Sequence, residues 1–333
     1  MACEATAYAR AGLIGNPSDG YFGKTISFII RDFSAKVTLY ENADLEIVPS
    51  LEDKSSYAGM RELVEDVQAN GYYGGIRLMK AAVKKFYDYC VKHGIVLPDV
   101  NFSIRYRSTI PRRLGMAGSS ALVTATIKCL MEFYDVDIPK PLLPNLILSV
   151  ETEELGIAAG LQDRVIQVYE GVVFMDFNRE LMERQGHGVY EEIDPSLLPP
   201  LFLAYRQDLG EGSEVIHNNV RQRWFDGDPK VIDAMHDFAS YAQETRDLLL
   251  AGRGMEIGPL MDKNFERRRS IFELDPRNVE MVEVARSVGA HGKYAGSGGA
   301  IVGMYYDEDM RLRLVDAMAR IGATIITPRI ESA

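Results

Sequence analysis

The stretch Pro111-Arg-Arg-Leu-Gly-Met-Ala-Gly-Ser-Ser-Ala-Leu122 combines glycines with hydroxyl side chains where a strand-like run gives way to a helix-like run. Gly115 and Gly118 permit backbone conformations that other residues rarely adopt, and they let main-chain amides approach a ligand closely. The first amides of a helix have no acceptor within the helix, and the helix dipole adds partial positive charge there. The stretch therefore predicts an anion site suited to a phosphate group.

The same stretch is also typical of ordinary helix capping, in which a glycine turn ends in Ser-Ser before a helix. It lacks the Gly-Lys-Ser/Thr ending of the common P-loop, and it lacks the Gly-x-Gly-x-x-Gly pattern of dinucleotide-binding loops. Taken alone, the residues leave both interpretations open.

Two carboxylates follow this stretch at positions that favour chemistry. Asp163 lies in an otherwise apolar segment, where it is either a helix cap or a general base for a substrate hydroxyl. Glu151 with Ser119 or Ser120 predicts a Mg²⁺ site, because this ion prefers carboxylate and hydroxyl oxygens beside substrate phosphates. The alternative for the acids at 151–154 is a solvated helix face.

Polar residues also surround an N-terminal turn, Gly15-Asn-Pro-Ser-Asp-Gly20. Arg10 precedes the turn, Asp19 lies within it and Lys24 follows it, so cations and a carboxylate converge there. The residues of the turn are common turn formers, so a plain polar hairpin is the alternative interpretation.

Composition limits the classes of function. The chain has 333 residues, of which 47% are hydrophobic and 26% charged, as in soluble globular proteins. Its net charge of -11 argues against a nucleic-acid partner, although a local cluster of Arg and Lys still allows an anionic substrate. Three scattered cysteines and five histidines show neither a disulfide framework nor metal-ligand spacing. Without a signal pattern or a membrane-length apolar run, we expect a cytoplasmic protein with no membrane partner.

The pattern of elements indicates an α+β chain rather than a doubly wound one, because strands and helices do not alternate strictly. Runs rich in β-branched and aromatic residues predict strands early in the chain, at 7–14, 25–30, 35–40 and 44–48. Helical patterns are clearest at 76–92, 145–155, 229–250, 256–272 and 276–288. A shift in composition near Asp194-Pro-Ser-Leu-Leu-Pro-Pro200 predicts the domain boundary, giving domains 1–197 and 198–333.

Three segments in this order resemble the signature motifs of the GHMP small-molecule kinases. They are Arg10-Ala-Gly-Leu-Ile-Gly-Asn-Pro-Ser-Asp19, Pro111-Arg-Arg-Leu-Gly-Met-Ala-Gly-Ser-Ser-Ala121 and Lys293-Tyr-Ala-Gly-Ser-Gly-Gly-Ala300. Further segments, among them Gly160-Leu-Gln-Asp-Arg-Val-Ile-Gln167 and Val220-Arg-Gln-Arg-Trp224, are similar to the plant-type glucuronokinase branch. The resemblance covers nearly the whole chain. It implies an N-terminal α+β domain with a left-handed βαβ unit, which binds ATP and Mg²⁺, and a ferredoxin-like C-terminal domain.

The resemblance also implies roles for individual residues. The ATP phosphates would lie on Gly115, Met116, Ala117, Gly118, Ser119, Ser120 and Ala121. Ser120 and Glu151 match the Mg²⁺ positions. Asp163 matches the catalytic aspartate, and Arg10 matches the basic residue beside it. Asp19, Lys24 and Gly299 match positions near the sugar, where Gly296, Ser297 and Gly298 would help Gly299 to close the site.

The sequence departs from the family at two places. Galactokinases carry Glu-His where this chain has Asn16-Pro17, which counts against galactose as the substrate. The middle loop reads Leu-Gly-Met-Ala-Gly-Ser-Ser rather than Gly-Leu-Gly-Ser-Ser, although the final Gly-Ser-Ser-Ala survives.

The resemblance therefore implies an ATP-dependent sugar 1-kinase acting on the anomeric hydroxyl of D-glucuronate, present as a monomer or homodimer. The alternatives are another sugar 1-kinase, for galacturonate, a heptose phosphate or arabinose, and a catalytically silent sugar or nucleotide sensor. A uronate needs a cation for its carboxylate, and arginine matches a carboxylate with two parallel donors. The candidates are Arg112, Arg113, Arg206, Arg267, Arg268 and Arg269, among which the sequence does not choose.

Overall fold

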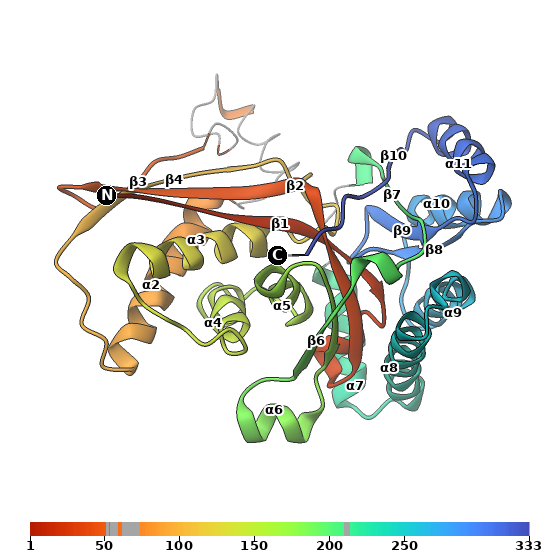
Figure 1. The fold of residues 1–333 in the computed structure, drawn as a ribbon, viewed down its shortest axis with the longest axis horizontal. Helices are drawn as coiled ribbons and strands as arrows, with labels where there is room; N and C mark the ends of the chain where they lie inside the picture. Colours follow the sequence, from red (N-terminus) through yellow and green to blue (C-terminus); the bar gives the residue numbers. More distant parts are fainter. Residues whose placement is uncertain (51–52, 54–58, 62–73, 210–213, 333) are drawn as a thin grey trace.

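The computed structural model describes residues 1–50, 53, 59–61, 74–209 and 214–332 of the chain. These residues form two sheets with helices packed against them (Figure 1). The first sheet and its helices come from the N-terminal part of the chain, and the second sheet comes from the C-terminal part. The α+β class predicted from the sequence is confirmed.

The first sheet is built on two long antiparallel strands, β1 (Ala2–Ile14) and β2 (Lys24–Asn42). The strand order is β3-β4-β2-β5-β6, and β1 also pairs with β2. The shorter strands are β3 (Glu46–Ile47), β4 (Asn101–Ser108), β5 (Val172–Asp176) and β6 (Val189–Ile193).

The prediction of two separate strands at 25–30 and 35–40 was wrong, because β2 runs through both. The polar residues Arg31 and Asp32 interrupt the apolar run between them and look like a turn in the sequence. In the sheet, the register shift between Tyr8 and Ala9 of β1 absorbs the extra residues, as Tyr8 faces Ser34 while Ala9 faces Ile30. The strand therefore continues through an irregularity that period-two patterning does not reveal.

In the described part of the chain, five helices accompany the first sheet (Figure 1). They are α2 (Gly75–Lys92), α3 (Gly118–Tyr134), α4 (Leu143–Ser149), α5 (Gln162–Tyr169) and α6 (Arg179–Gln185). Of these, α3 and α5 pack directly against β1 and β2, while α2 and α4 pack on α3. The predicted helix at 145–155 is divided, because α4 passes into a wider π-helical turn, η2 (Val150–Glu154). Cys129 on α3 is buried, as its place on the apolar stripe predicts. Within the described ranges, no helix has the length and apolarity needed to cross a bilayer.

The second sheet has strand order β10-β7-β9-β8. Its strands are β7 (Leu201–Tyr205), β8 (His291–Tyr294), β9 (Ala300–Met304) and β10 (Thr324–Ile326). The accompanying helices are α7 (Glu214–Phe225), α8 (Pro229–Leu250), α9 (Gly258–Arg269), α10 (Pro276–Ser287) and α11 (Glu308–Arg320). Helices separate β7 from β8 and β9 from β10, which with this strand order gives the ferredoxin-like arrangement. That prediction is confirmed.

The domain boundary at 197/198 and the handedness of the βαβ unit stay predictions. The two sheets do divide between β6 and β7. The largest hydrophobic cluster nevertheless joins residues from both sides, including Val37 and Leu201. The C-terminal tail also returns to the first sheet, where the backbone amide of Arg31 donates to the carbonyl of Arg329 at 3.0 Å. The two halves therefore share this cluster, while a second cluster lies within the C-terminal half.

A buried lysine fastens the two halves together beside the N-terminal turn. Lys293 on β8 is 1% exposed. Its Nζ donates to the carbonyl of Gly12 at 2.7 Å, to Oδ1 of Asn16 at 2.6 Å and to the carbonyl of Tyr294 at 2.8 Å. Burial, and then the charges of Arg268 and Arg10, lower the pKa of Lys293 well below its ordinary value. Three hydrogen bonds at short distance offset the free-energy cost of burying the ammonium group, and they fix the N-terminal turn against β8.

We predict that Lys293→Met lowers the free energy of unfolding by about 1–3 kcal/mol, because three buried acceptors lose their donor. Urea unfolding followed by circular dichroism measures this difference. Lys263→Met is the matched control, because Lys263 is exposed on α9. Equal stability of the two variants would contradict a fastening role for Lys293.

Candidate active site

The loop from Pro111 to Ala117 joins β4 to α3 with an irregular backbone. Arg113, Gly115 and Ala117 have φ angles of 59°, 63° and 61°, which lie in the left-handed region. Ala117 is the N-cap of α3, and no described side chain caps this helix. Left-handed conformations at non-glycine residues cost free energy and gather at functional sites. The first turn of α3 thus presents its amides without a side-chain acceptor, as an anion site requires.

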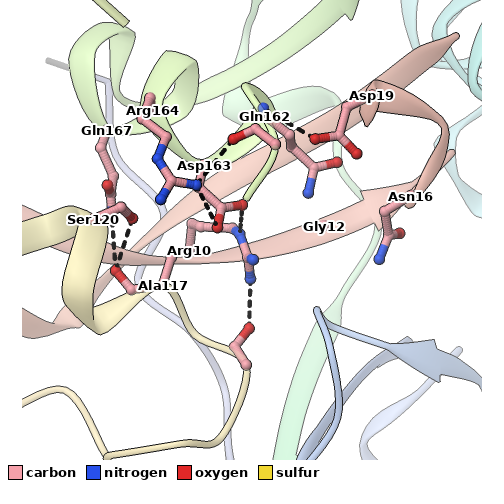
Figure 2. Close-up of polar contacts among 12 residues, drawn as sticks. Arg10, Gly12, Asn16, Asp19, Ala117, Ser120, Gln162, Asp163, Arg164 and Gln167 are labelled. Atoms are coloured by element: carbon pink, nitrogen blue, oxygen red, sulfur yellow. Dashed lines mark hydrogen bonds and ion pairs between the residues drawn. The ribbon is translucent and has the colours of Figure 1, made fainter. Parts of the chain in front are cut away.

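The carbonyl of Ala117 holds this loop in place (Figure 2). It accepts hydrogen bonds from Nε2 of Gln167 at 3.0 Å, from Oγ of Ser120 at 3.1 Å and from the backbone amide of Ala121 at 3.1 Å. Gln167 is fully buried on α5. The sequence analysis missed this residue, although its position four residues after Asp163 places both on one face of the helix.

Arg10 on β1 joins three segments of the site. Its Nε donates to Oδ1 of Asp163 at 2.6 Å, and its Nη1 donates to the carbonyl of Gly115 at 2.5 Å (Figure 2). Nη1 also lies 3.4 Å from the carbonyl of Ala295. Arg10 is 6% exposed, so the whole guanidinium is held inside the protein. The structure therefore brings the predicted pair Arg10 and Asp163 together beside the glycine loop.

The environment of Asp163 keeps its carboxylate ionised. Burial raises the pKa of Asp163, but the charges of Arg10 and Arg164, with hydrogen bonds from Arg10 and Gln162, outweigh burial and lower it below its ordinary value. The side chain remains 20% exposed. An ionised, partly accessible carboxylate with both neighbours fixed is suited to orient a hydroxyl group and to accept its proton.

Arg164 links Asp163 to the predicted metal ligand Glu151. Arg164 forms an ion pair with Glu151, and these side chains are 3% and 2% exposed. Its Nη1 donates to the carbonyl of Gly160 at 2.9 Å and lies 3.5 Å from Oδ2 of Asp163. The carboxylate of Glu151 is thus already neutralised by an arginine, a partner that the sequence analysis did not assign to it.

Asp19 lies in η1 (Ser18–Tyr21), close to the start of α5. Its Oδ2 accepts a hydrogen bond from the backbone amide of Gln162 at 3.3 Å (Figure 2). A Cβ atom at Gly160 would stand 2.1 Å from this oxygen, so only glycine leaves room for the carboxylate. Burial and repulsion from Asp163 raise the pKa of Asp19 to about 6. Two carboxylates with different pKa values therefore share one site.

Lys24 is tied to neighbours other than Asp163. It forms an ion pair with Asp176 at 3.2 Å and donates to Oε1 of Gln243 at 2.7 Å. Its predicted role beside the substrate stays a prediction.

The glycine run at 296–299 packs directly on the loop before α3. A Cβ atom at Gly296 would stand 2.1 Å from the carbonyl of Gly115, and one at Gly115 would stand 2.7 Å from the carbonyl of Gly298. Gly299, with φ of 80°, donates its amide to Oδ1 of Asn278 at 2.8 Å. These glycines let two backbones touch, so they form one wall of the site.

The residues predicted to hold Mg²⁺ fit that ion in part. Ser120 donates its hydroxyl hydrogen to Ala117, which leaves oxygen lone pairs for a metal. Glu151 would share its carboxylate with Arg164. Across the described part of the chain, no three His, Cys, Asp or Glu side chains gather as a metal cluster. Such a sparse donor set suits Mg²⁺, which takes most of its ligands from phosphates and water.

Comparison with known proteins identifies the family. Residues 77–171 match the model of the GHMP kinases N terminal domain, a range that includes α3 and α5. Glucuronokinase 1 of Arabidopsis thaliana is 44% identical over 333 residues, covering 98% of this chain and 91% of the relative. The chain belongs to the GHMP kinases. Members of this family are phosphotransferases that use ATP and an alcohol acceptor.

Other GHMP kinases support the assignment. Probable glucuronokinase 2 of Arabidopsis thaliana is 44% identical over 332 residues, covering 98% of this chain and 90% of the relative. The solved structure of the Methanococcus jannaschii mevalonate kinase has a TM-score of 0.71 at 21% identity, covering 100% of this chain and 98% of that one. This structural likeness confirms the predicted GHMP kinase fold.

We predict that Asp19→Asn stabilises the protein at pH 8 but not at pH 4. The folded pKa of Asp19 is raised to about 6 from an ordinary 3.8, so its stabilising contribution is complete below about 3.8 and is lost as pH rises through 6. Removing the charge should restore on the order of 1 kcal/mol at pH 8. Urea unfolding at both pH values measures the effect, with the exposed Asp135→Asn as control. An equal gain in the free energy of unfolding at pH 4 and pH 8 would refute the raised pKa of Asp19 as its cause.

Proposed function

We propose that this GHMP kinase is a glucuronokinase, which transfers the γ-phosphoryl group of ATP to the anomeric hydroxyl of D-glucuronate and gives D-glucuronate 1-phosphate. The two Arabidopsis relatives carry this activity in their names, and each covers nearly the whole chain at 44% identity. The observation that carries the proposal is the Arg10–Asp163 pair, which stands beside the uncapped start of α3.

We assign a distinct task to each part of the site. The amides at the start of α3, with Gly115 and its neighbours in the loop, bind the phosphates of ATP. The carboxylate of Asp163 orients the acceptor hydroxyl and accepts its proton while the oxygen forms its bond to phosphorus. The lowered pKa of Asp163 makes it a weak base before transfer, so its main contribution is orientation.

Arg10 fixes the Asp163 carboxylate by donating to one of its oxygens, and it holds the loop by donating to Gly115. Its positive charge also offsets the negative charge that builds up between the reactants. Asp19, which accepts a hydrogen bond from the backbone amide of Gln162, also accepts hydrogen bonds from hydroxyl groups of the sugar.

We propose Mg²⁺ as the metal of this reaction, held by the hydroxyl of Ser120 and by Glu151. The ion would neutralise phosphate charge as the transfer proceeds. The hydroxyl of Ser120 is fixed by its hydrogen bond to Ala117, and its oxygen keeps lone pairs for a metal. Glu151 would share its carboxylate between the metal and Arg164.

The direct test is ADP release from ATP with D-glucuronate, D-galacturonate and D-galactose as acceptors. We expect turnover with glucuronate, lower turnover with galacturonate and least with galactose. Absence of turnover with glucuronate while another sugar is phosphorylated would move the assignment to that sugar.

In Asp163→Asn, turnover should fall by about 10²- to 10⁴-fold, the contribution of a positioned acid–base group. Stabilisation by Mg-ADP should persist. Asp233→Asn on the exposed face of α8 is the matched control.

A metal titration tests the role of Ser120. In Ser120→Ala, the Mg²⁺ concentration that gives half-maximal ADP release should rise by about tenfold, because one hydroxyl ligand is lost. Ser287→Ala at the exposed end of α10 is the control, because this hydroxyl lies outside the site. Identical titration curves for the wild type and Ser120→Ala would remove this residue from the metal site.

A further inference from the structure

Two polar groups are buried without partners beside the glycine run at 296–299. Arg268 on α9 is 3% exposed, and Tyr294 on β8 is 2% exposed. The Nε of Arg268 and the hydroxyl of Tyr294 have no hydrogen-bond partner among the described residues. The guanidinium carbon of Arg268 lies 5.0 Å from the ring centroid of Tyr294. Buried polar groups are nearly always paired, so these unpaired donors on two neighbouring side chains indicate a missing acceptor.

Arg268 differs from the other arginines that are candidates for binding a carboxylate. Arg206 pairs with Asp208 and Glu280, Arg267 with Asp237, and Arg269 with Glu283. Arg112 and Arg113 are exposed on the loop before α3. Arg268 has no carboxylate partner in the described structure, and its one recorded hydrogen bond is a long one of 3.5 Å from Nη2 to the carbonyl of Ser297.

The charges around Arg268 also favour a bound anion. Arg268 lies near two other buried cations, Arg10 and Lys293, each of which contributes repulsion. Arg10 has the carboxylate of Asp163, but the acceptors of Lys293 are neutral. Burial lowers the pKa of Arg268 to about 10. A buried guanidinium without a counter-ion is costly unless a ligand supplies the negative charge.

The position of Arg268 favours the acceptor substrate over the nucleotide as the source of that charge. Asn264, one helical turn earlier on α9, accepts a hydrogen bond from the amide of Gly15 at 2.8 Å and donates to the carbonyl of Asn16 at 3.3 Å. The same face of α9 therefore contacts the N-terminal turn that leads to Asp19. The amides for the nucleotide phosphates belong instead to α3, which reaches this region through the contact of Gly115 with the glycine run.

We infer that Arg268, with the hydroxyl of Tyr294, binds the carboxylate of the sugar acid and so selects uronates over neutral sugars. The inference rests on the proposed function and adds a residue that decides the substrate. A carboxylate can accept from Nε of Arg268 and from the Tyr294 hydroxyl, which would satisfy both unpaired donors. Arg268 is here a substrate-binding residue and takes no part in the transfer itself.

The test compares steady-state kinetics of the wild type, Arg268→Ala, Arg268→Lys and Tyr294→Phe, with glucuronate and with D-glucose as the uncharged counterpart. In Arg268→Ala the KM for glucuronate should rise by about ten- to hundredfold, because a charge-assisted contact is lost. The KM for ATP and the turnover of glucose should stay within about twofold. Arg268→Lys should recover part of the loss, because it keeps the charge without the planar fork.

Tyr294→Phe separates a binding role from a structural one. Its hydroxyl has no hydrogen-bond partner within the described ranges, so its removal should leave the melting temperature unchanged or higher. The KM for glucuronate should still rise, by about two- to fivefold. Arg267→Ala and Arg269→Ala are the matched controls, since these neighbours pair with Asp237 and Glu283 and should leave the KM for glucuronate as in the wild type.

The outcomes are distinct. A rise in the KM for ATP, with glucuronate unaffected, would overturn the inference and assign Arg268 to a nucleotide phosphate. Equal losses with glucuronate and glucose would overturn it in favour of a purely structural role. Failure of the wild type to phosphorylate glucuronate at all would refute the proposed function, and the inference with it. If Arg268→Ala does not fold, Arg268→Lys and Tyr294→Phe give the same comparison.

Discussion

The structure depends on one guanidinium group. Arg10 contacts Asp163, the carbonyl of Gly115 and the carbonyl of Ala295, which lie 153, 105 and 285 positions away in the chain. A planar group with several fixed donors can hold such partners in one geometry, and a lysine could not do so at the same positions. The carboxylate proposed to be catalytic, the loop proposed to bind phosphate and the glycine run of the C-terminal half are therefore placed relative to each other by a single side chain.

Alternating charges extend this arrangement into the protein. Arg10, Asp163, Arg164 and Glu151 follow each other in order, so each buried charge has an opposite neighbour. This series keeps Asp163 ionised despite burial, while burial and then repulsion from Asp163 raise the pKa of nearby Asp19 to about 6. One site thus holds two carboxylates in different protonation regimes, which separates the tasks of the two groups. Arg268 is not part of this series of ion pairs, and we infer that a bound carboxylate supplies its opposite charge.

The glycines explain how two distant loops reach each other. Gly115 and Gly296 bring two backbones so close that a Cβ atom on either would collide with main-chain atoms of the other loop. The contact between the N-terminal and C-terminal halves is therefore made at the site itself. Lys293 and Asn264 secure the same junction from the second half by binding Gly12, Gly15 and Asn16. The site lies at this junction because the two loops pack so closely at Gly115 and Gly296 that neither position has room for a side chain.

The sequence by itself determined the family motifs, the ferredoxin-like half and the pairing of Arg10 with Asp163, because short motifs fix local backbone chemistry. It did not determine that Glu151 is neutralised by Arg164, that Gln167 holds Ala117, or that Arg268 has no carboxylate partner among the described residues. Those facts depend on which side chains meet across α3, α5, α9 and β8. Burial and ion pairing are properties of the packed fold, so only the tertiary structure could distinguish Arg268 from its neighbours Arg267 and Arg269, which have carboxylate partners.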